Sequence, residues 1–202
     1  MSSAVIDLAY DGYGRMVCRI EHELLRGVSP QMLAWWFRNL GGDTELEGRR
    51  LAKYLVWHPT DHSHWELVSE APEGGAGVGA RFRIVEAFNG NRAYTIDVTE
   101  EVLRLDDEGL TLVNRPFGVE VTRLNHDFIA AEGGTLYRST LTVGVALPLV
   151  GRLINAFLYR FVFTEDMGRA WLRHNVEEVG ALEHILPLFG DAGSTPKPSP
   201  TT

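Results

Sequence analysis

A run of short segments between Ala80 and Gly144 restricts the fold of this chain more than any other feature. Apolar and polar residues alternate in six segments, at residues 80–88, 93–98, 102–105, 110–114, 117–130 and 136–144. Such alternation is typical of strands that bury one face. Turn residues such as Asn89-Gly90 separate the segments, and none of the intervals is long enough for a helix. The pattern therefore predicts an antiparallel meander rather than a parallel sheet.

Helical signals lie on both sides of this predicted sheet. Ser29-Pro30 is a favourable helix start, and the helix it opens should end near Gly41-Gly42. A second short helix is expected from Asp43 to Lys53, and a long helix from Thr164 to Pro187. This order predicts an α+β fold, in which a curved antiparallel sheet wraps around the long C-terminal helix and leaves an internal cavity.

The length of 202 residues suits one domain with short additions. We expect an N-terminal extension at residues 1–28, one folded domain at 29–189 and a disordered tail at 190–202, where Pro, Ser, Thr and Gly dominate. The segment from Val143 to Phe163 is apolar, but Arg152 and Arg160 within it would be costly in lipid. It therefore predicts a buried connection followed by a helix, and no membrane span.

Charge and cysteine content exclude several classes of protein. With 19 Lys and Arg against 27 Asp and Glu, the formal net charge is −8, which argues against a nucleic-acid partner. Cys18 is the only cysteine, so neither an internal disulfide nor a zinc finger can form. The first residues lack the pattern of a secretory signal, so we expect a cytoplasmic protein.

Two ionisable residues lie on the apolar face of the predicted last helix. At about 100° per residue, His174 and Glu178 fall in the same sector as Met167 and Trp171. The spacing of four residues places the two side chains one turn apart. They are either an intrahelical hydrogen-bonded pair or half of a metal site.

The predicted strands also carry ionisable residues on their apolar faces. Glu86 shares a face with Phe82 and Ile84, where it either pairs with a buried arginine, marks a bulge or binds a ligand. His126 alternates with Leu124 and Phe128. It is either a hydrogen-bonded core residue or a catalytic group.

A short segment from Trp57 to His64 holds three histidines and an aspartate, which offer further ligands unless they form a surface turn. Two histidines and two glutamates around one cavity would make a four-ligand nitrogen and oxygen site for a divalent metal. Without thiolates, mixed imidazole and carboxylate ligands favour zinc, with manganese, iron or nickel as alternatives.

These motifs resemble the family of 2,4-diacetylphloroglucinol hydrolase and phloretin hydrolase. The stretch from Tyr54 through Trp57 to His62 is similar to the family pattern Y-x-x-W-x-P-x-x-H, and His174 to Glu178 is similar to its H-x-x-x-E pair. His126, through Gly133-Gly134 and Arg138-Ser139 to Gly144, resembles a strand pair of the family. The resemblance implies a Bet v 1-like, or START-like, helix-grip catalytic domain with zinc in its cavity.

The resemblance also implies roles for individual residues. His62, Glu86, His174 and Glu178 would bind zinc, with another carboxylate as the alternative to Glu86. His126 would lie near the reacting carbonyl. Substrate would contact the side chains of Tyr54, Trp57, Trp65 and Trp36.

Two departures from the family pattern affect these expectations. The N-terminal dimerisation region of the family has at most residues 1–28 as its counterpart, so the chain is expected to be a monomer or a homodimer. Trp65 replaces an amide that helps to hold a phenolic oxygen in the family. This departure affects the contacts to a phloroglucinol substrate and leaves the predicted metal site intact.

The sequence thus predicts a zinc-dependent hydrolase that cleaves a carbon–carbon bond of a small hydrophobic acyl-phenol or polyketide-like ketone. Two alternatives remain open. One is a metal-free carrier of hydrophobic ligands with the same fold. The other is a polyketide cyclase or dehydratase that uses His126 and a carboxylate as acid and base.

Overall fold

The structure, a computed structural model, describes residues 4–46 and 48–189. Its strands are β1 (Val5–Tyr10), β2 (Met16–Glu21), β3 (Leu25–Arg26), β4 (Asp43–Leu46), β5 (Arg49–Ala52), β6 (His62–Ser69), β7 (Arg81–Ala87), β8 (Thr95–Asp106), β9 (Gly109–Asn114), β10 (Thr122–Ala131) and β11 (Gly134–Val143). Its α-helices are α1 (Pro30–Arg38), α2 (Lys53–Trp57), α3 (Gly151–Phe161) and α4 (Glu165–Ile185). Short 3-10 turns include η1 (Phe88–Gly90) and η4 (Leu186–Phe189).

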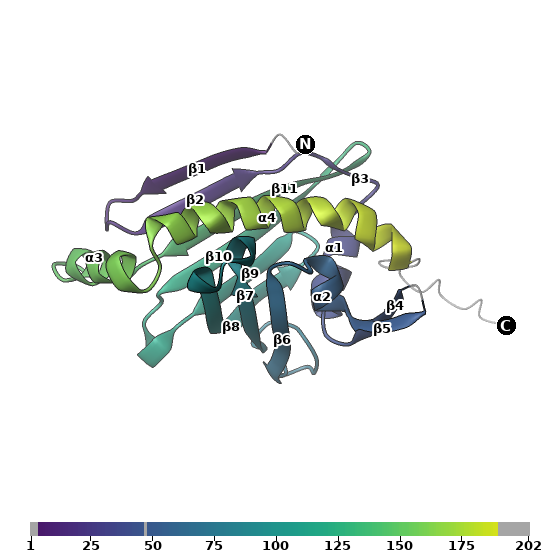
Figure 1. Cartoon of the computed structure of the whole chain (residues 1–202), viewed down its shortest axis with the longest axis horizontal. Helices are drawn as coiled ribbons and strands as arrows, with labels where there is room; N and C mark the ends of the chain where they lie inside the picture. The colour runs from purple at the N-terminus through teal and green to yellow at the C-terminus, as the bar shows by residue number, and fades with distance from the viewer. Residues whose placement is uncertain (1–3, 47, 190–202) are drawn as a thin grey trace.

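Nine of these strands form one antiparallel sheet in the order β1-β2-β11-β10-β9-β8-β7-β6, with β3 also paired to β11. Figure 1 shows α4 lying along this sheet, with β1 and β2 at one edge and β6 at the other. The predicted meander from β7 to β11 and the long C-terminal helix are therefore confirmed. A sheet that wraps around one helix is the arrangement expected from the sequence.

One difference within the meander has a local cause. The segments at 93–98 and 102–105 belong to a single strand, β8, because its pairing with β7 runs without interruption from Thr95 to Glu101. Its pairing with β9 begins at Glu101 and continues past a register shift between Val102 and Arg104. A β-bulge adds one residue to a strand and interrupts the alternation of its faces. The sequence pattern breaks before this bulge, at Thr99-Glu100-Glu101, because the buried Glu100 takes an inward position where an apolar residue is expected.

Residues at the N-terminus are part of the main sheet. β2 pairs with β11 over the whole length of β2, from Met16 opposite Val143 to Glu21 opposite Arg138. The expected boundary between residues 28 and 29 therefore has no counterpart in the sheet. The expected tail at 190–202 lies outside the described residues.

The predicted helix from Asp43 to Lys53 is wrong. β4 and β5 form a hairpin there, and α2 begins only at Lys53. Gly48 adopts a positive φ of 72° in the turn, which glycine accepts without strain. The hairpin also lets Arg50 on β5 pair with Asp43 on β4, with 2.6 Å between Arg50 Nε and Asp43 Oδ2. In contrast, α1 begins as predicted, with the Ser29 hydroxyl accepting a hydrogen bond from the Met32 amide.

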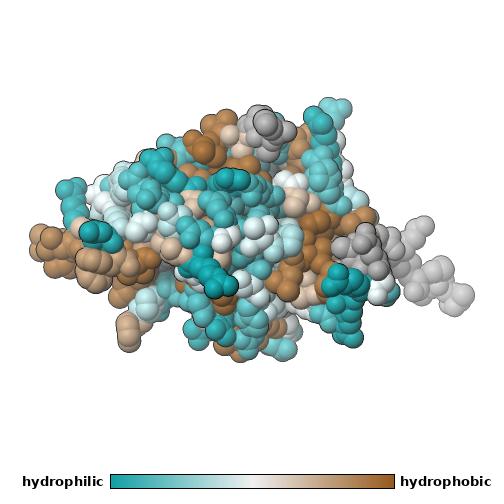
Figure 2. Space-filling model, in the orientation of Figure 1, coloured by the Kyte–Doolittle hydropathy of each residue, from teal (hydrophilic) through white to brown (hydrophobic). Residues whose placement is uncertain are grey.

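The apolar segment before α4 is a helix, but it is not buried. In α3 the side chains of Leu153, Phe157 and Phe161 are 75 %, 59 % and 67 % exposed. Figure 2 shows hydrophobic surface gathered over α3 at the left end of the molecule. Among the described residues, no helix is long and apolar enough to cross a membrane.

The long helix α4 carries two of the predicted site residues into the core. Thr164 caps its start by accepting a hydrogen bond from the Met167 amide. One apolar cluster, which includes Trp36, Phe82 and Leu182, packs towards the C-terminal end of α4. A second, which includes Phe88 and Trp171, packs towards the N-terminal end. His174 and Glu178 lie on the buried face of the helix.

Candidate metal centre

Three elements bring the four predicted ligands to one place under α4. His62 is the first residue of β6, and it is the register partner of Glu86 on β7. His174 and Glu178 project from α4 onto this pair. All four residues, named here the His/Glu cluster, are at most 9 % exposed. Ionisable groups at this depth need partners, because burial of an unpaired charge is costly.

Each of the two imidazoles faces both carboxylates through its Nε2 atom. His62 Nε2 lies 3.5 Å from Glu86 Oε1 and 3.3 Å from Glu178 Oε2. His174 Nε2 lies 3.5 Å from Glu86 Oε2 and 3.6 Å from Glu178 Oε2. Potential ligand atoms of His62, Glu86 and His174 all lie within 4.8 Å of one another. This spacing suits donors arranged around a common centre.

The opposite nitrogen of each imidazole is occupied by an acceptor. His62 Nδ1 donates to the Tyr54 carbonyl oxygen at 2.9 Å, and His174 Nδ1 donates to Asp61 Oδ2 at 2.9 Å. Because a carbonyl oxygen only accepts, the proton of neutral His62 is on Nδ1 and the lone pair is on Nε2. Outer hydrogen bonds of this kind orient metal-binding histidines.

One atom in the cluster lacks the partner that its burial requires. Among the described residues, His62 Nε2 is fully buried and has no hydrogen-bond partner. Buried polar atoms are nearly always paired with protein, water or an ion. A lone pair that faces two carboxylates can bind a metal ion but cannot accept a hydrogen bond from the ionised carboxylates. The donor set of two imidazoles and two carboxylates therefore fits zinc.

Each carboxylate is also held by a donor outside the cluster. The Tyr54 hydroxyl donates to Glu86 Oε1, and Asn175 Nδ2 donates to Glu178 Oε1. Trp57 Nε1 donates to the backbone carbonyl of Glu178 at 2.8 Å. Glu178 Oε2 and Glu86 Oε2 remain directed towards the imidazoles. Tyr54 and Trp57, predicted as substrate contacts, thus lie where they orient the predicted ligands.

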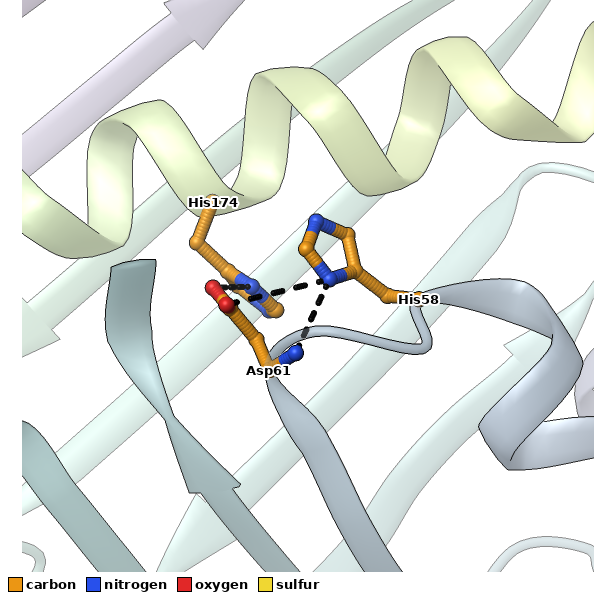
Figure 3. Close-up of side chains that lie close together, drawn as sticks. All are labelled: His58, Asp61 and His174. Carbon is orange, nitrogen blue, oxygen red and sulfur yellow. Dashed lines mark hydrogen bonds and ion pairs between the residues drawn. The ribbon is translucent and has the colours of Figure 1, made fainter. Parts of the chain in front are cut away.

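Asp61 supports His174 from a buried position (Figure 3). Its oxygens accept hydrogen bonds from the backbone amides of Asn89 and Gly90, at 2.8 Å each, in addition to the bond from His174. Burial alone would raise the pKa of Asp61, but these hydrogen bonds and the charge of His174 lower it to about 2. Asp61 therefore remains ionised and fixes the His174 ring.

An alternative set of ligands, His58, Asp61 and His174, also has its atoms within 4.8 Å of one another. In this set both Asp61 oxygens are already committed to backbone amides, and His58 Nδ1 accepts from the Asp61 amide at 3.3 Å. These bonds would compete with a metal for the same lone pairs. The His/Glu cluster, whose Nε2 atoms are not engaged in this way, is the better candidate.

Charges in the cluster act strongly on one another. Burial lowers the pKa of His174, but Glu178, Glu86 and Asp61 outweigh it and raise that pKa to about 9. Burial raises the pKa of Glu178, but His174 and His62 outweigh it and lower that pKa to about 2. The carboxylates thus stabilise a positive charge at this position, which a proton on His174 or a metal cation can supply.

Two small cavities adjoin the cluster. One of about 100 Å³ is lined mostly by apolar residues such as Ile84, Phe88 and Trp171, and its polar lining residues are Glu86, Glu100, Thr122 and Glu178. A second of about 50 Å³ is lined by Trp57, Trp65 and His126. A drug-sized ligand usually occupies about 300 Å³ or more. The cavities therefore suit a small substrate, or require side chains to move for a larger one.

The aromatic residues predicted to contact substrate differ in position. Trp57 and Trp65 line the smaller cavity. Trp36 is fully buried with its ring 5.8 Å from that of Trp57, and it is not among the residues that line either cavity. Trp36 supports Trp57 from behind, while its predicted contact with substrate remains a prediction.

His126 lines the smaller cavity beside Glu178, as expected for a group near a reacting atom. Its Nδ1 is 3.0 Å from the Ser139 hydroxyl, its register partner on β11. Burial lowers the pKa of His126 to about 4, although Glu178 opposes this shift. His126 is therefore a neutral imidazole near pH 7, which can donate or accept one proton.

Sequence reasoning missed several buried polar residues around the cluster. The sequence offers Asp61 only as a possible ligand, and Asn175 is hidden next to the more conspicuous His174. Glu100 follows Ile96 and Val98 at a spacing of two, which does predict an inward side chain. Burial and the neighbouring Glu86 raise the pKa of Glu100 to about 7, while a hydrogen bond from Thr122 opposes this shift.

Comparisons with known proteins support the fold. No family model and no curated protein matches this chain. A START superfamily protein from Mycobacterium smegmatis aligns with a TM-score of 0.52 at 11 % identity, over 87 % of this chain and 98 % of that one. A protein from Thermus thermophilus aligns with a TM-score of 0.51 at 15 % identity, over 93 % and 99 % of the two chains.

A plant protein gives a similar result. Ginseng major latex-like protein 151 from Panax ginseng aligns with a TM-score of 0.50 at 11 % identity, over 85 % of this chain and 95 % of that one. These likenesses show the START/Bet v 1-like helix-grip fold, in agreement with the fold expected from the sequence. At such low identity they carry no information about activity, since one fold hosts many functions.

Proposed function

We propose that this protein is a zinc-dependent hydrolase that cleaves a carbon–carbon bond of a small hydrophobic acyl-phenol or polyketide-like ketone. One observation carries the metal-dependent part of the proposal. The Nε2 atoms of His62 and His174 face both carboxylates of the His/Glu cluster, while both Nδ1 atoms are bound to acceptors. Hydrogen-bonded cores satisfy their imidazoles, but this core leaves His62 Nε2 without a partner within the described chain.

His62, Glu86, His174 and Glu178 would hold the metal. Zinc bound there would supply Lewis acidity towards a ketone oxygen and towards water. Four protein ligands leave room for substrate only if one carboxylate shifts or the coordination number rises to five. The same imidazole and carboxylate ligands would also accept manganese, iron or nickel.

The other residues of the site have roles that follow from their positions. His126 is neutral and lines the cavity, so its free ring nitrogen can deliver a proton to the leaving carbon. Trp57 and Trp65 supply an apolar wall that keeps water away from the substrate. Tyr54 keeps Glu86 in position. The choice of an acylated aromatic ketone rests on the resemblance of the Tyr54–His62 and His174–Glu178 motifs.

The first experiment measures metal in the purified protein. We expect one equivalent of zinc in the wild type and a large loss in His62→Ala and Glu178→Ala. His64→Ala is the matched control, because His64 belongs to the same strand as His62 but is exposed. Full retention of zinc by both cluster variants would overturn the metal site. Acylphloroglucinols and 1,3-diketones are then screened as substrates, with loss of turnover on chelation as the expected result.

A second candidate function, a metal-free carrier of hydrophobic ligands, is favoured by the fold and by the apolar lining of the larger cavity. In a carrier, His174 and Glu178 would anchor the polar end of the ligand. The same metal measurement separates the two candidates. A protein purified without metal, which binds an apolar fluorescent probe equally well with and without added zinc, is a carrier.

A further inference from the structure

Ser139 lies between two buried histidines. Its hydroxyl oxygen is 3.0 Å from His126 Nδ1 and 3.0 Å from His22 Nε2. Three neighbouring strands position these groups, because β11 lies between β10 and β2, and His126 is the register partner of Ser139. His22 follows directly after β2, where its backbone amide donates to the Tyr137 carbonyl. The three side chains therefore form a line of two hydrogen bonds, from His22 through Ser139 to His126, which we call the line.

The two ends of this line face different spaces. At one end, the His126 ring lines the cavity that also holds Glu178, and no hydrogen bond within the described residues engages its Nε2. At the other end, His22 lines a separate pocket of about 220 Å³ together with Leu25, Gly180 and His184. His184 is exposed, so this pocket opens at the surface. The line joins the cavity beside the His/Glu cluster to a surface pocket between α4 and the segment that follows β2.

In a relay, the Ser139 hydroxyl donates its one proton to one histidine and accepts a hydrogen bond from the other, which gives two arrangements of protons. If both histidines donated to the Ser139 oxygen, its proton would point elsewhere and the two rings would have opposite tautomers. If His22 donates through Nε2, His126 accepts at Nδ1 and carries its own proton on Nε2, towards the cavity. If His126 donates through Nδ1, His22 accepts at Nε2 and carries its proton on Nδ1. Both rings thus have the same tautomer in either arrangement.

We propose that His22, Ser139 and His126 form a proton relay that reloads His126 from the surface pocket. This inference rests on the proposed hydrolase, in which His126 Nε2 gives its proton to the leaving carbon. The Ser139 proton then passes to His126 Nδ1, the His22 Nε2 proton passes to the Ser139 oxygen, and His22 Nδ1 takes a proton from water. Every bond to hydrogen that breaks is matched by one that forms, and His126 then carries its proton on Nδ1. The next water to enter the cavity gives a proton to His126 Nε2, the relay runs in reverse, and His22 Nδ1 returns a proton to the surface pocket. One full cycle thus adds one water across the carbon–carbon bond and restores the starting tautomers.

The surroundings of both rings suit this exchange. Burial lowers the pKa of His22 and of His126 to about 4 in each case, so both rings are neutral near pH 7. Glu178 opposes the shift at both rings, and the Asn175 side chain opposes it at His22. Tyr137 and Phe37 are the aromatic neighbours that limit water around the line. A relay of neutral tautomers avoids a buried imidazolium, which would be costly here.

Nitrogen NMR of the histidine side chains tests the relay without substrate. In the wild type, as purified and after addition of zinc, we expect His22 and His126 to be neutral at pH 7 and to share one tautomer. Ser139→Ala removes the connecting hydroxyl, so the tautomer populations of the two rings should become independent. Opposite tautomers in the wild type, or an unchanged His126 signal in Ser139→Ala, would overturn the relay. This test remains valid even if the protein binds no zinc.

Turnover gives a second test once a substrate is known. We expect Ser139→Ala and His22→Gln to lower kcat about 10- to 100-fold with little change in KM, and to enlarge the solvent isotope effect. His22→Gln keeps a hydrogen-bonding group beside Ser139 but has no second nitrogen to reload. His184→Gln, in the same surface pocket, is the control. Unchanged kcat in both relay variants, with zinc retained, would overturn the relay and leave the hydrolase intact.

Discussion

Asp61 holds His174 through the ring nitrogen that points away from the His/Glu cluster, with 2.9 Å between Asp61 Oδ2 and His174 Nδ1. Both side chains are about 1 % exposed. The same carboxylate also receives the backbone amides of Asn89 and Gly90, so it connects the turn after β7 to the middle of α4. This single carboxylate therefore sets the orientation of one predicted ligand relative to the strand that carries another.

Asp61→Asn should weaken metal binding. In the variant, the side-chain NH2 group would face a backbone N–H group, and neither of these two donors could accept a hydrogen bond from the other. Loss of the negative charge would also lower the basicity of His174 and weaken its bond to the metal. We expect zinc affinity to fall about 10- to 100-fold, as is typical for such outer partners. We also expect a loss of about 1–3 kcal/mol in the free energy of unfolding, because a buried amide is left unpaired. Chelator competition and urea unfolding measure the two effects.

Asp97→Asn is the control for this variant, since Asp97 is exposed and pairs with Arg83 at the surface, with 2.8 Å between Arg83 Nη2 and Asp97 Oδ2. It should leave zinc affinity unchanged. An Asp61→Asn protein that binds zinc within twofold of the wild type would contradict the orienting role of Asp61.

Tyr54→Phe separates two roles that the sequence could not distinguish. The Tyr54 ring stacks on His62 with 4.0 Å between centroids, and its hydroxyl donates to Glu86. Phenylalanine keeps the stacking and removes the donor. If Tyr54 orients the ligand Glu86, zinc affinity should fall about 10-fold. If instead KM rises and zinc affinity does not change, Tyr54 contacts substrate as the motif resemblance implies.

Glu100 should make stability depend on pH. Its pKa is about 7 in the folded protein, above the ordinary value of 4.5, so between these values the folded state binds more protons than the unfolded state. The free energy of unfolding therefore decreases as the pH rises from about 4.5 to 7, by about 3 kcal/mol from this group. Glu100→Gln should remove this decrease.

The comparison uses urea unfolding of the chelator-treated proteins at pH 5 and pH 8. Glu101→Gln is the matched control, because Glu101 is the next residue on β8 and is partly exposed beside Arg115. We expect Glu100→Gln to be more stable than the wild type at pH 8 and nearly equal to it at pH 5. An equal difference at both values would show that Glu100 does not titrate in this range.

The sequence predicts those helices and strands that are marked by a pattern of apolar residues within one segment. Period-two segments indicate β7 to β11, and an apolar stripe with a capping Thr164 indicates α4. The same reasoning places His62, Glu86, His174 and Glu178 on inward faces, and the fold brings all four together. Their role as ligands remains a prediction.

Other features depend on contacts between distant residues and cannot be read from local pattern. The pairing of β2 with β11 joins segments more than 100 residues apart, so no local pattern marks β1 and β2 as part of the sheet. The contacts of Ser139 with His22 and His126 require three strands in register. α3 shows the opposite error, since its apolar composition suggests burial although most of its large side chains are exposed.

Gly109 and Gly180 should respond to alanine in opposite directions. A Cβ atom at Gly109, the first residue of β9, would lie 2.2 Å from the His126 carbonyl oxygen, so β9 and β10 would have to separate next to His126. We expect Gly109→Ala to lower the free energy of unfolding by about 3 kcal/mol or more. Backbone atoms cannot move aside as a flexible side chain can.

At Gly180 in α4, no atom lies within 4 Å of the corresponding Cβ position. Alanine there should raise the free energy of unfolding by about 0.5–1 kcal/mol, because alanine favours the helix more than glycine does. Thermal or urea unfolding of both variants measures the difference. A Gly109→Ala protein as stable as the wild type would contradict the close approach of β9 to His126, on which the placement of that histidine in the cavity depends.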